Sequence, residues 1–518
     1  MHQNPPTRRH LLGTTVLGAC ALSLGLMTSP AALAQNNARV LSVGMPFSPL
    51  SMDPSISGNG RAGVHLSPAY EPLIRTQADG KFAAALATAW SISPDSKEAT
   101  FTLRQNAKFS DGEPVTAEAV KKSIEYFVGK KGPFSGNLAS MTGIEILDKY
   151  KFKVKLSQPQ PGLLSLFDAY FNSGDIISPK ALEKPDQLGS ATFGAGPYKL
   201  DTAATITGKS YTYVPNEHYY DKSRIKWDKV VVQVFEDQNA GIQAMKAGQL
   251  KVLVSDPFTG NANAGNLPAD LRIVSDPVQW TGLILADREG VFQPELKDVR
   301  VRQAINYALD RKLISQALFG KMAEPSAQLQ SKGFMGYDPE IEKRYPYNPE
   351  KAKALLAEAG YPNGFELRLQ YVNNTLSRFL TMAVAGQLKK VGIRPVTEEF
   401  QNFGAMLAAE RNKKIGALMF NSNSGVPTLA RFQTLGKGSL NFYKSEDATL
   451  TKLMEDAALL PLDKAEASWK KVYAHVADIA WFAPVVASHT VYFVSNSVKS
   501  PRIGQSVVID LIDFVPAK

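Results

Sequence analysis

The most informative stretch of this chain is ATFTLRQNAKFSDGEPVTAEAVKKSIEYF, residues 99–127. Apolar and polar residues alternate over 99–104, which predicts a half-buried strand. An Asp-Gly pair followed by proline within 110–114 predicts a turn. Thr116 can then N-cap a helix whose apolar face is formed by Val120, Ile124, Phe127 and Val128. The stretch therefore predicts a strand, a turn and a capped helix in direct succession.

Other segments predict a mixed α/β chain. Residues 40–45 form a short apolar strand pattern, and 364–371 form another. An apolar stripe over 298–320, made by Val301, Ile305, Ala308, Leu309 and Leu313, predicts a helix that Gly320 ends. Further helices are predicted from Asn348 with Pro349 at the first position, across 380–391 up to Gly392, and from Asp463 to Val476.

The sequence of residues 101–120 resembles a motif of the extracellular solute-binding proteins of the dipeptide, oligopeptide and nickel type, family 5. The motif is F-x-L-R-x-x-x-K-F-x-D-G-x-P-x-T-A-x-x-V. Further segments similar to the family's motifs occur at 52–54, 70–74, 193–200, 214–220 and 301–311. Two of these segments depart from the family pattern: Ala195 replaces a threonine, and residues 214–220 lack an arginine and a tryptophan. The resemblance thus covers nearly the whole chain after its first 35 residues.

This resemblance implies an α/β, two-lobe periplasmic-binding-protein fold, class II-like, with an extra subdomain inserted in lobe I. By analogy, lobe I comprises residues 35–279 and 488–518, and its extra subdomain spans about 76–190. Lobe II comprises residues 280–487. In such a fold two lobes close around a ligand and sequester it without chemistry.

Residues 1–34 are expected to be a secretory signal peptide. Arg8 and Arg9 precede an apolar run, and Ala32-Leu33-Ala34 matches a cleavage site. The paired arginines leave twin-arginine export open beside ordinary secretion. Cys20 lies in a fair lipobox, but apolar residues follow it, so cleavage after Ala34 and a periplasmic protein without a lipid anchor are favoured.

Composition excludes several function classes. The only cysteine lies in the signal segment, so the mature chain has neither a disulfide nor a catalytic thiol. No stretch after residue 35 is long and apolar enough to span a bilayer. The net charge is +10, but the basic residues are scattered among acids rather than gathered into a stripe, which argues against nucleic acid as a partner.

Catalytic and cofactor motifs are missing from the sequence. Gly208-Lys209-Ser210 resembles the end of a phosphate-binding loop, but Ala203 stands where its first glycine is required, so a hairpin turn is predicted instead. The histidines after residue 34 show no metal-ligand spacing, and no nucleophile motif occurs. The sequence therefore predicts a monomeric binding protein with no cofactor and no metal, not an enzyme.

A loop of lobe II bears on the ligand. Peptide-binding members have a segment resembling W-x-x-D-Y-P-D-P there, with a carboxylate that pairs with the peptide's α-ammonium; residues 418–428 have neither aspartate. Their neutral side chains and the nearby Arg431 suit carboxylates, hydroxyls or amides better than an ammonium group. The expected ligand-binding residues are Phe47, Trp280, Tyr371, Asn373, Asn421, Ser422, Asn423, Arg431 and His489. A plain polar loop at 421–424, and packing roles for the others, remain open alternatives.

The expected function is that of the periplasmic substrate-binding component of an ABC importer. It would capture a small polar solute, peptide-like or carboxylated, and deliver it to a membrane permease driven by a separate ATPase. A protein that binds a nickel chelate is the second expectation. An exported hydrolase and a structural or chaperone protein are the rivals from other classes.

Overall fold

The quoted stretch folds as its pattern predicts. In the computed structural model, β5 (Glu98–Leu103) buries alternate residues, and Gly112 takes a positive φ of 89° in the turn. Helix α2 (Ala117–Gly129) begins after Thr116, whose side-chain oxygen accepts a hydrogen bond from the backbone N–H of Ala119 at 3.2 Å. The structure describes residues 39–57, 63–160, 162–425, 434–436, 440–502, 504 and 510–517. Residues 39–518 form a single compact unit.

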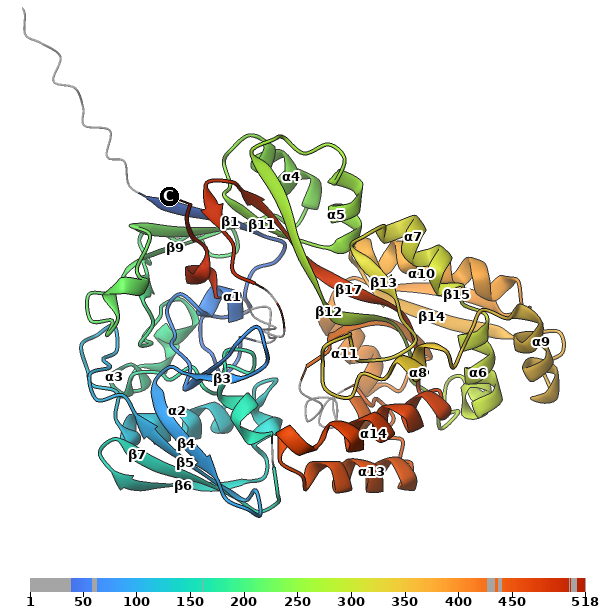
Figure 1. Cartoon of the computed structure of the whole chain (residues 1–518), viewed down its shortest axis with the longest axis horizontal. Helices are drawn as coiled ribbons and strands as arrows, with labels where there is room; N and C mark the ends of the chain where they lie inside the picture. The colour runs from blue at the N-terminus through green and yellow to red at the C-terminus, as the bar shows by residue number, and fades with distance from the viewer. Residues whose placement is uncertain are drawn as a thin grey trace, which may run out of the picture. The chain divides into compact units, whose positions relative to one another are not determined.

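Strand β5 belongs to a small antiparallel sheet with its own core. The strand order is β4 (Ala87–Ile92), β5, β7 (Lys151–Leu156) and β6 (Met141–Asp148). Phe101 stacks on Phe152 with ring centroids 5.1 Å apart, and Phe167 meets Phe101 edge-on. The buried residues of α2 belong to the same hydrophobic cluster, so this helix covers the sheet (Figure 1).

A larger mixed sheet organises the rest of the chain. Its path is β15-β14-β16-β12-β17-β11-β1-β10-β9-β8, and β13 (Ala323–Pro325) pairs with β17 outside that path. The strands are β1 (Val40–Met45), β8 (Tyr198–Leu200), β9 (Ser210–Pro215), β10 (Lys229–Val234), β11 (Val252–Ser255), β12 (Leu271–Leu285), β14 (Glu366–Val372), β15 (Arg394–Phe400), β16 (Ala417–Asn423) and β17 (Phe482–Ser495).

Two long antiparallel strands, β12 and β17, join the two halves of this sheet (Figure 1). At one end β17 pairs with β11, and at the other end β12 pairs with β16. We call the described residues of 39–270 and 496–517 the first lobe, and those of 286–481 the second lobe. Each lobe has hydrophobic clusters of its own, around Val43 and Phe101 in the first and around Leu380 and Trp469 in the second. Most of the apolar surface of each lobe is buried within that lobe, and Phe334 of the second lobe packs into the cluster around Val43.

Further elements surround these sheets. The helices are α1 (Gly63–Leu66), α3 (Pro179–Leu182), α4 (Gln238–Lys246), α5 (Pro257–Asn263), α6 (Val299–Tyr307), α7 (Arg311–Phe319), α8 (Pro339–Glu342), α9 (Pro349–Glu358), α10 (Thr375–Lys389), α11 (Phe403–Arg411), α13 (Ala448–Ala458) and α14 (Glu466–Asp478). Two short strand pairs are β2 (Ile74–Thr76) with β3 (Phe82–Ala84), and β18 (Val498–Lys499) with β19 (Val515–Pro516). Among the described residues, no helix has the length and apolar character needed to cross a membrane.

The structure confirms most predicted elements and corrects one. Asn348 caps α9 with Pro349 at its first position, and Gly208 lies in a hairpin turn. The single helix predicted over 298–320 is instead α6 followed by α7. Asp310 causes the break, because its carboxylate accepts from the backbone N–H of Leu313 at 3.0 Å and so caps a second helix. Leu313, predicted to face the core, is 52% exposed.

Candidate functional site

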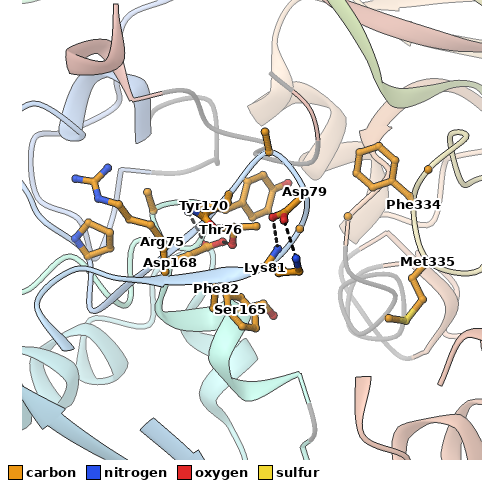
Figure 2. Close-up of a pocket in the computed structure, with 18 of the residues that line it drawn as sticks. Arg75, Thr76, Asp79, Lys81, Phe82, Ser165, Asp168, Tyr170, Phe334 and Met335 are labelled. Atoms are coloured by element: carbon orange, nitrogen blue, oxygen red, sulfur yellow. Dashed lines mark hydrogen bonds and ion pairs between the residues drawn. The ribbon is translucent and has the colours of Figure 1, made fainter. Parts of the chain in front are cut away.

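A cavity of about 1170 Å³ has walls from both lobes (Figure 2). The first lobe contributes residues of 67–90 and 165–171, together with Pro501, Arg502, Asp510 and Asp513 of the C-terminal segment. The second lobe contributes residues of 333–339, Gly425 and side chains around the start of α14. A cavity of this size accommodates a small organic molecule or a short peptide.

The walls combine aromatic surface with many polar and charged side chains. Phe334 and Met335 of the second lobe lie across the cavity from Phe82 and Tyr170 of the first lobe (Figure 2). The other aromatic lining residues are Tyr70, Trp90, Phe171 and Tyr337. Such walls offer a ligand both ring surface and polar partners.

Asp168 lies on the first-lobe wall, and both of its carboxylate oxygens accept hydrogen bonds. One carboxylate oxygen accepts from the Thr76 hydroxyl at 2.7 Å, and the other accepts from the backbone N–H of Tyr170 at 2.8 Å. Asp168 directly follows the short 3-10 helix Leu163–Phe167, and Thr76 ends β2. Burial raises the pKa of Asp168 to about 6, although both hydrogen bonds favour its charged form.

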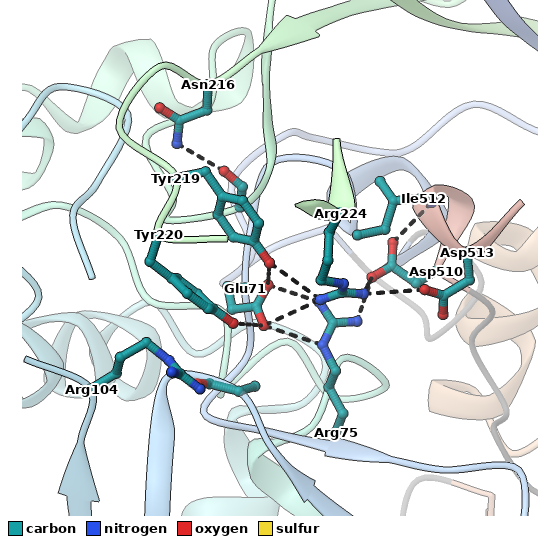
Figure 3. Close-up of polar contacts among 12 residues, drawn as sticks. Glu71, Arg75, Arg104, Asn216, Tyr219, Tyr220, Arg224, Asp510, Ile512 and Asp513 are labelled. Carbon is teal, nitrogen blue, oxygen red and sulfur yellow. Dashed lines mark hydrogen bonds and ion pairs between the residues drawn. The ribbon is translucent and has the colours of Figure 1, made fainter. Parts of the chain in front are cut away.

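A buried ion-pair cluster holds Arg75 in the same wall (Figure 3). Glu71 is fully buried and accepts from Arg75 at 2.8 and 3.2 Å, from the Tyr219 hydroxyl at 3.0 Å and from the Tyr220 hydroxyl at 3.0 Å. Arg75 also pairs with Asp510. Burial acts to raise the pKa of Glu71, but the surrounding positive charges and hydroxyl donors lower it overall.

This cluster fixes the C-terminal segment against the first lobe. Arg224 pairs with Asp513 at 3.1 Å and lies 3.7 Å from both Glu71 and Asp510. The backbone carbonyl of Phe514 accepts from the Trp227 indole at 2.6 Å. Because Asp510 and Asp513 also line the cavity, the cluster positions part of the cavity wall.

None of the predicted residues 421–423 lines the cavity, but Asn423 contacts a residue that does. Asn423 ends β16, and its side-chain amide donates to the Tyr170 hydroxyl at 3.2 Å, which links the second lobe to the first. Gly425, two residues on, lines the cavity. Asn421 donates to the side-chain oxygen of Gln279 at 3.0 Å, and Ser422 pairs with Trp280 across β12. Their contact with a ligand stays a prediction.

Other predicted residues lie away from the cavity lining. Trp280 is buried against Phe482, with ring centroids 5.5 Å apart. The hydroxyl of Tyr371 donates to Glu399 at 3.0 Å, and the side-chain oxygen of Asn373 accepts from Arg378 at 2.9 Å. The structure does not bring these three side chains together with the cavity residues.

His489 and Phe47 also have partners elsewhere. The Nδ1 atom of His489 lies 3.1 Å from the Ser275 hydroxyl, and burial lowers the pKa of this histidine. The carbonyl oxygen of Phe47 lies 3.1 Å from Nε2 of His65. Arg431 falls outside the described residues. Within the described ranges, no group of three or more histidine, cysteine, aspartate and glutamate side chains is arranged to hold a metal.

His65, which the sequence did not single out, makes folding depend on pH. It is fully buried against Phe47 and Tyr211, and burial lowers its pKa from about 6.5 to about 4. Between pH 6.5 and 4, His65 is therefore protonated in the unfolded chain and neutral in the folded chain. We expect stability to be retained above pH 6.5 and to fall by about 3 kcal/mol as the pH drops to 4.

Urea denaturation at pH 7.0 and pH 4.5 checks this expectation. Carboxylates also titrate in this range, so the His65→Gln variant is the reference: its loss of stability between the two pH values should be smaller than that of wild type. Equal losses in both proteins would contradict the assignment of the effect to His65.

Sequence reasoning missed the residues that form the first-lobe wall. Thr76, Asp168 and Tyr170 lie at the end of a short strand and after a short 3-10 helix, where the sequence shows no periodic pattern. They meet only because β2 and the 163–171 segment pack together. The Asn-Ser pattern at 421–424 was the one local signal that pointed toward this part of the molecule.

Comparison with known proteins gives three kinds of likeness. Residues 81–442 match the model of the bacterial extracellular solute-binding proteins, family 5, middle. The glutathione-binding protein GsiB of Salmonella paratyphi A is 28% identical over 392 residues, which covers 72% of each chain.

The periplasmic binding protein AgaA of A. tumefaciens, solved with agropinic acid, is 25% identical with a TM-score of 0.77 and covers 92% of this chain and 96% of its own. The Helicobacter pylori protein DppA, solved with the peptide STSA, is 21% identical with a TM-score of 0.80, covers 92% of this chain and 98% of its own, and shares the fold.

Proposed function

This chain belongs to family 5 of the bacterial extracellular solute-binding proteins, and we propose that it captures a small polar solute in the cavity between its lobes. It is the substrate-binding component of an ABC importer and delivers the solute to a membrane permease that a separate ATPase drives. The cavity carries this proposal, because its aromatic and polar walls come from both lobes and can enclose a ligand.

The proposed solute is peptide-like or a carboxylated metabolite. The names of the similar proteins support this class: glutathione for GsiB and agropinic acid for AgaA. Each is a small polar molecule of the size that a cavity of about 1170 Å³ can hold. We further propose that Asn421, Ser422 and Asn423 contribute neutral donors and acceptors from the second lobe.

Closure of two lobes is the proposed mechanism of capture. We assign residues 35–279 and 488–518 to lobe I, with an extra subdomain at about 76–190, and residues 280–487 to lobe II. The pairing of β12 with β17 supports this division, because these strands connect the main hydrophobic clusters of the two halves of the chain. The hydrogen bond from Asn423 to Tyr170 supports it as well, since closed lobes need contacts across the cavity. A periplasmic monomer, exported by a signal peptide at residues 1–34 that is then removed, completes the proposal.

A thermal-unfolding screen of the purified protein tests this function. The panel contains di- and tripeptides, glutathione, agropinic acid, simple dicarboxylates and nickel with histidine. A bound solute at one hundred times its dissociation constant stabilises the folded state by about 2.7 kcal/mol. We expect a concentration-dependent rise in melting temperature with a peptide-like or carboxylated compound. A response to the nickel complex alone would favour a metal-chelate carrier.

Two further measurements separate the proposal from its rivals. Chromatography of the solute after incubation should recover it unchanged, whereas conversion to a product would indicate a hydrolase. Deletion of the gene should abolish uptake of the same solute. A protein that responds to no compound in the panel would not be a solute carrier of this class.

A further inference from the structure

We propose that the solute carries a protonated amino group and that Asp168, on the first-lobe wall, binds this group. This inference rests on the proposed function, since it names a chemical feature of the solute held in the same cavity. It places recognition of a cation on the opposite lobe from the neutral 421–424 segment.

The carboxylate of Asp168 is held in place and lacks a positive partner. The Thr76 hydroxyl and the Tyr170 backbone N–H fix its two oxygens, and the residue lines the cavity (Figure 2). In the described part of the chain, no lysine, arginine or histidine nitrogen lies within 4 Å of it. A partly buried carboxylate without a countercharge is an unfavourable arrangement that a bound cation relieves.

The other charges of the wall are already paired. Arg75 is engaged by Glu71 and Asp510, Lys81 lies 3.1 Å from Asp79, and Lys470 lies 3.5 Å from Glu466. These arginine and lysine side chains therefore have their charge balanced within the protein. Asp463 and Arg502, which also line the cavity, are exposed to solvent, so water can solvate their charges.

Asp175 adds a second negative group behind this wall. It is only 4% exposed, and one of its carboxylate oxygens has no hydrogen-bond partner among the described residues. Burial raises the pKa of Asp175, and the neighbouring charge of Asp168 raises it further. A cation bound at Asp168 would lower the electrostatic cost of both groups, whereas a ligand carboxylate at this position would raise it.

Aromatic side chains complete a cation site. Tyr170 is fixed by edge-on contact with Phe171, with ring centroids 4.8 Å apart, and by the hydrogen bond that its hydroxyl accepts from Asn423. Tyr170 and Phe82 both line the cavity near Asp168 (Figure 2). Aromatic faces attract ammonium groups, so the wall offers a carboxylate and ring surface to the same cation.

Affinity selection with two matched peptide libraries tests this inference. Wild-type protein is incubated with a tripeptide library bearing free amino termini, with the same library acetylated at its amino termini, and with glutathione; retained compounds are identified by mass spectrometry after gel filtration. To remove other amino groups, both libraries omit lysine. We expect the protein to retain compounds with a free amino group, whether library peptides or glutathione. The acetylated forms should bind at least thirtyfold more weakly.

Variants assign the effect to Asp168. Asp168→Asn should weaken binding of the retained compound about thirtyfold while the unliganded protein melts no lower than wild type. The amide oxygen can still accept from the Tyr170 backbone N–H, the amide NH2 can donate to the Thr76 hydroxyl oxygen, and a buried charge is removed. Asp168→Glu should retain part of the affinity. Asp456→Asn, which alters an exposed aspartate that pairs with Lys452 and does not line the cavity, should bind as wild type does.

The outcomes separate this inference from the proposed function. Equal retention of the acetylated library, or unchanged affinity in Asp168→Asn, would overturn the role of Asp168. Binding of a dicarboxylate without any free-amine compound would overturn the inference and leave solute binding intact. Failure of every compound, in this test and in the melting screen, would overturn both.

Discussion

Glu71→Gln is expected to lower the free energy of unfolding by about 3–5 kcal/mol, because it removes the charge at the centre of a buried ion-pair cluster. Glu71 has no exposed surface and accepts hydrogen bonds from Arg75 and from the hydroxyls of Tyr219 and Tyr220. Glutamine removes one of the two buried carboxylates, Glu71 and Asp510, that balance the charges of Arg75 and Arg224 (Figure 3). Urea denaturation at pH 7 measures the loss.

The matched control is Glu217→Gln. Glu217, like Glu71, forms an ion pair, in this case with Lys199 at 2.8 Å, but its side chain is 58% exposed. The expected loss in the free energy of unfolding is therefore below about 1 kcal/mol. Equal effects of the two substitutions would contradict the central role given to Glu71. The C-terminal segment should also become more susceptible to proteolysis in Glu71→Gln, since Arg75 and Arg224 hold Asp510 and Asp513.

Gly282→Ala is the second substitution with a large expected effect, a loss of about 3 kcal/mol in the free energy of unfolding. Gly282 lies in β12, where the pairing with β17 shifts register. A Cβ atom there would lie 2.4 Å from the carbonyl oxygen of Ala483 and 2.5 Å from Cα of Pro484. Backbone atoms cannot rotate away as a side chain can, so the strands that connect the lobes must separate.

Gly143→Ala provides the control for this prediction. Gly143 also lies in a strand, β6, but nothing lies within 4 Å of the position that its Cβ would take. Denaturation should show little change or a small gain for Gly143→Ala. A Gly282→Ala protein as stable as wild type would mean that the β12–β17 pairing tolerates extra volume, contrary to the structure.

The sequence predicted local structure well wherever a side chain acts on its own backbone. Thr116 and Asn348 cap helices because a hydroxyl or amide oxygen needs only the next few N–H groups. The same rule explains the failure at 298–320. The apolar stripe suggested continuity, whereas the cap at Asp310 starts a new helix and turns Leu313 toward solvent.

The cavity was far less predictable, because its walls depend on contacts between distant segments. Asp168 acquires its role from Thr76, 92 residues earlier, and Glu71 acquires partners from the distant Tyr219 and Arg224. No local sequence pattern indicates contacts between residues so far apart in the chain. Trp280 illustrates the converse: its position in the sequence suggested a cleft residue, and its environment is the apolar cluster around Phe482.

Native mass spectrometry tests the central claim most directly, that this protein holds an unmodified solute in the cavity between its lobes. Protein purified without unfolding is examined with the responding compound from the melting screen, before and after prolonged incubation, for wild type and for Asp168→Asn. We expect a complex of one protein with one solute, released with its mass unchanged, and weaker occupancy in the variant. A spectrum with no bound solute, or release of a compound of altered mass, would contradict it.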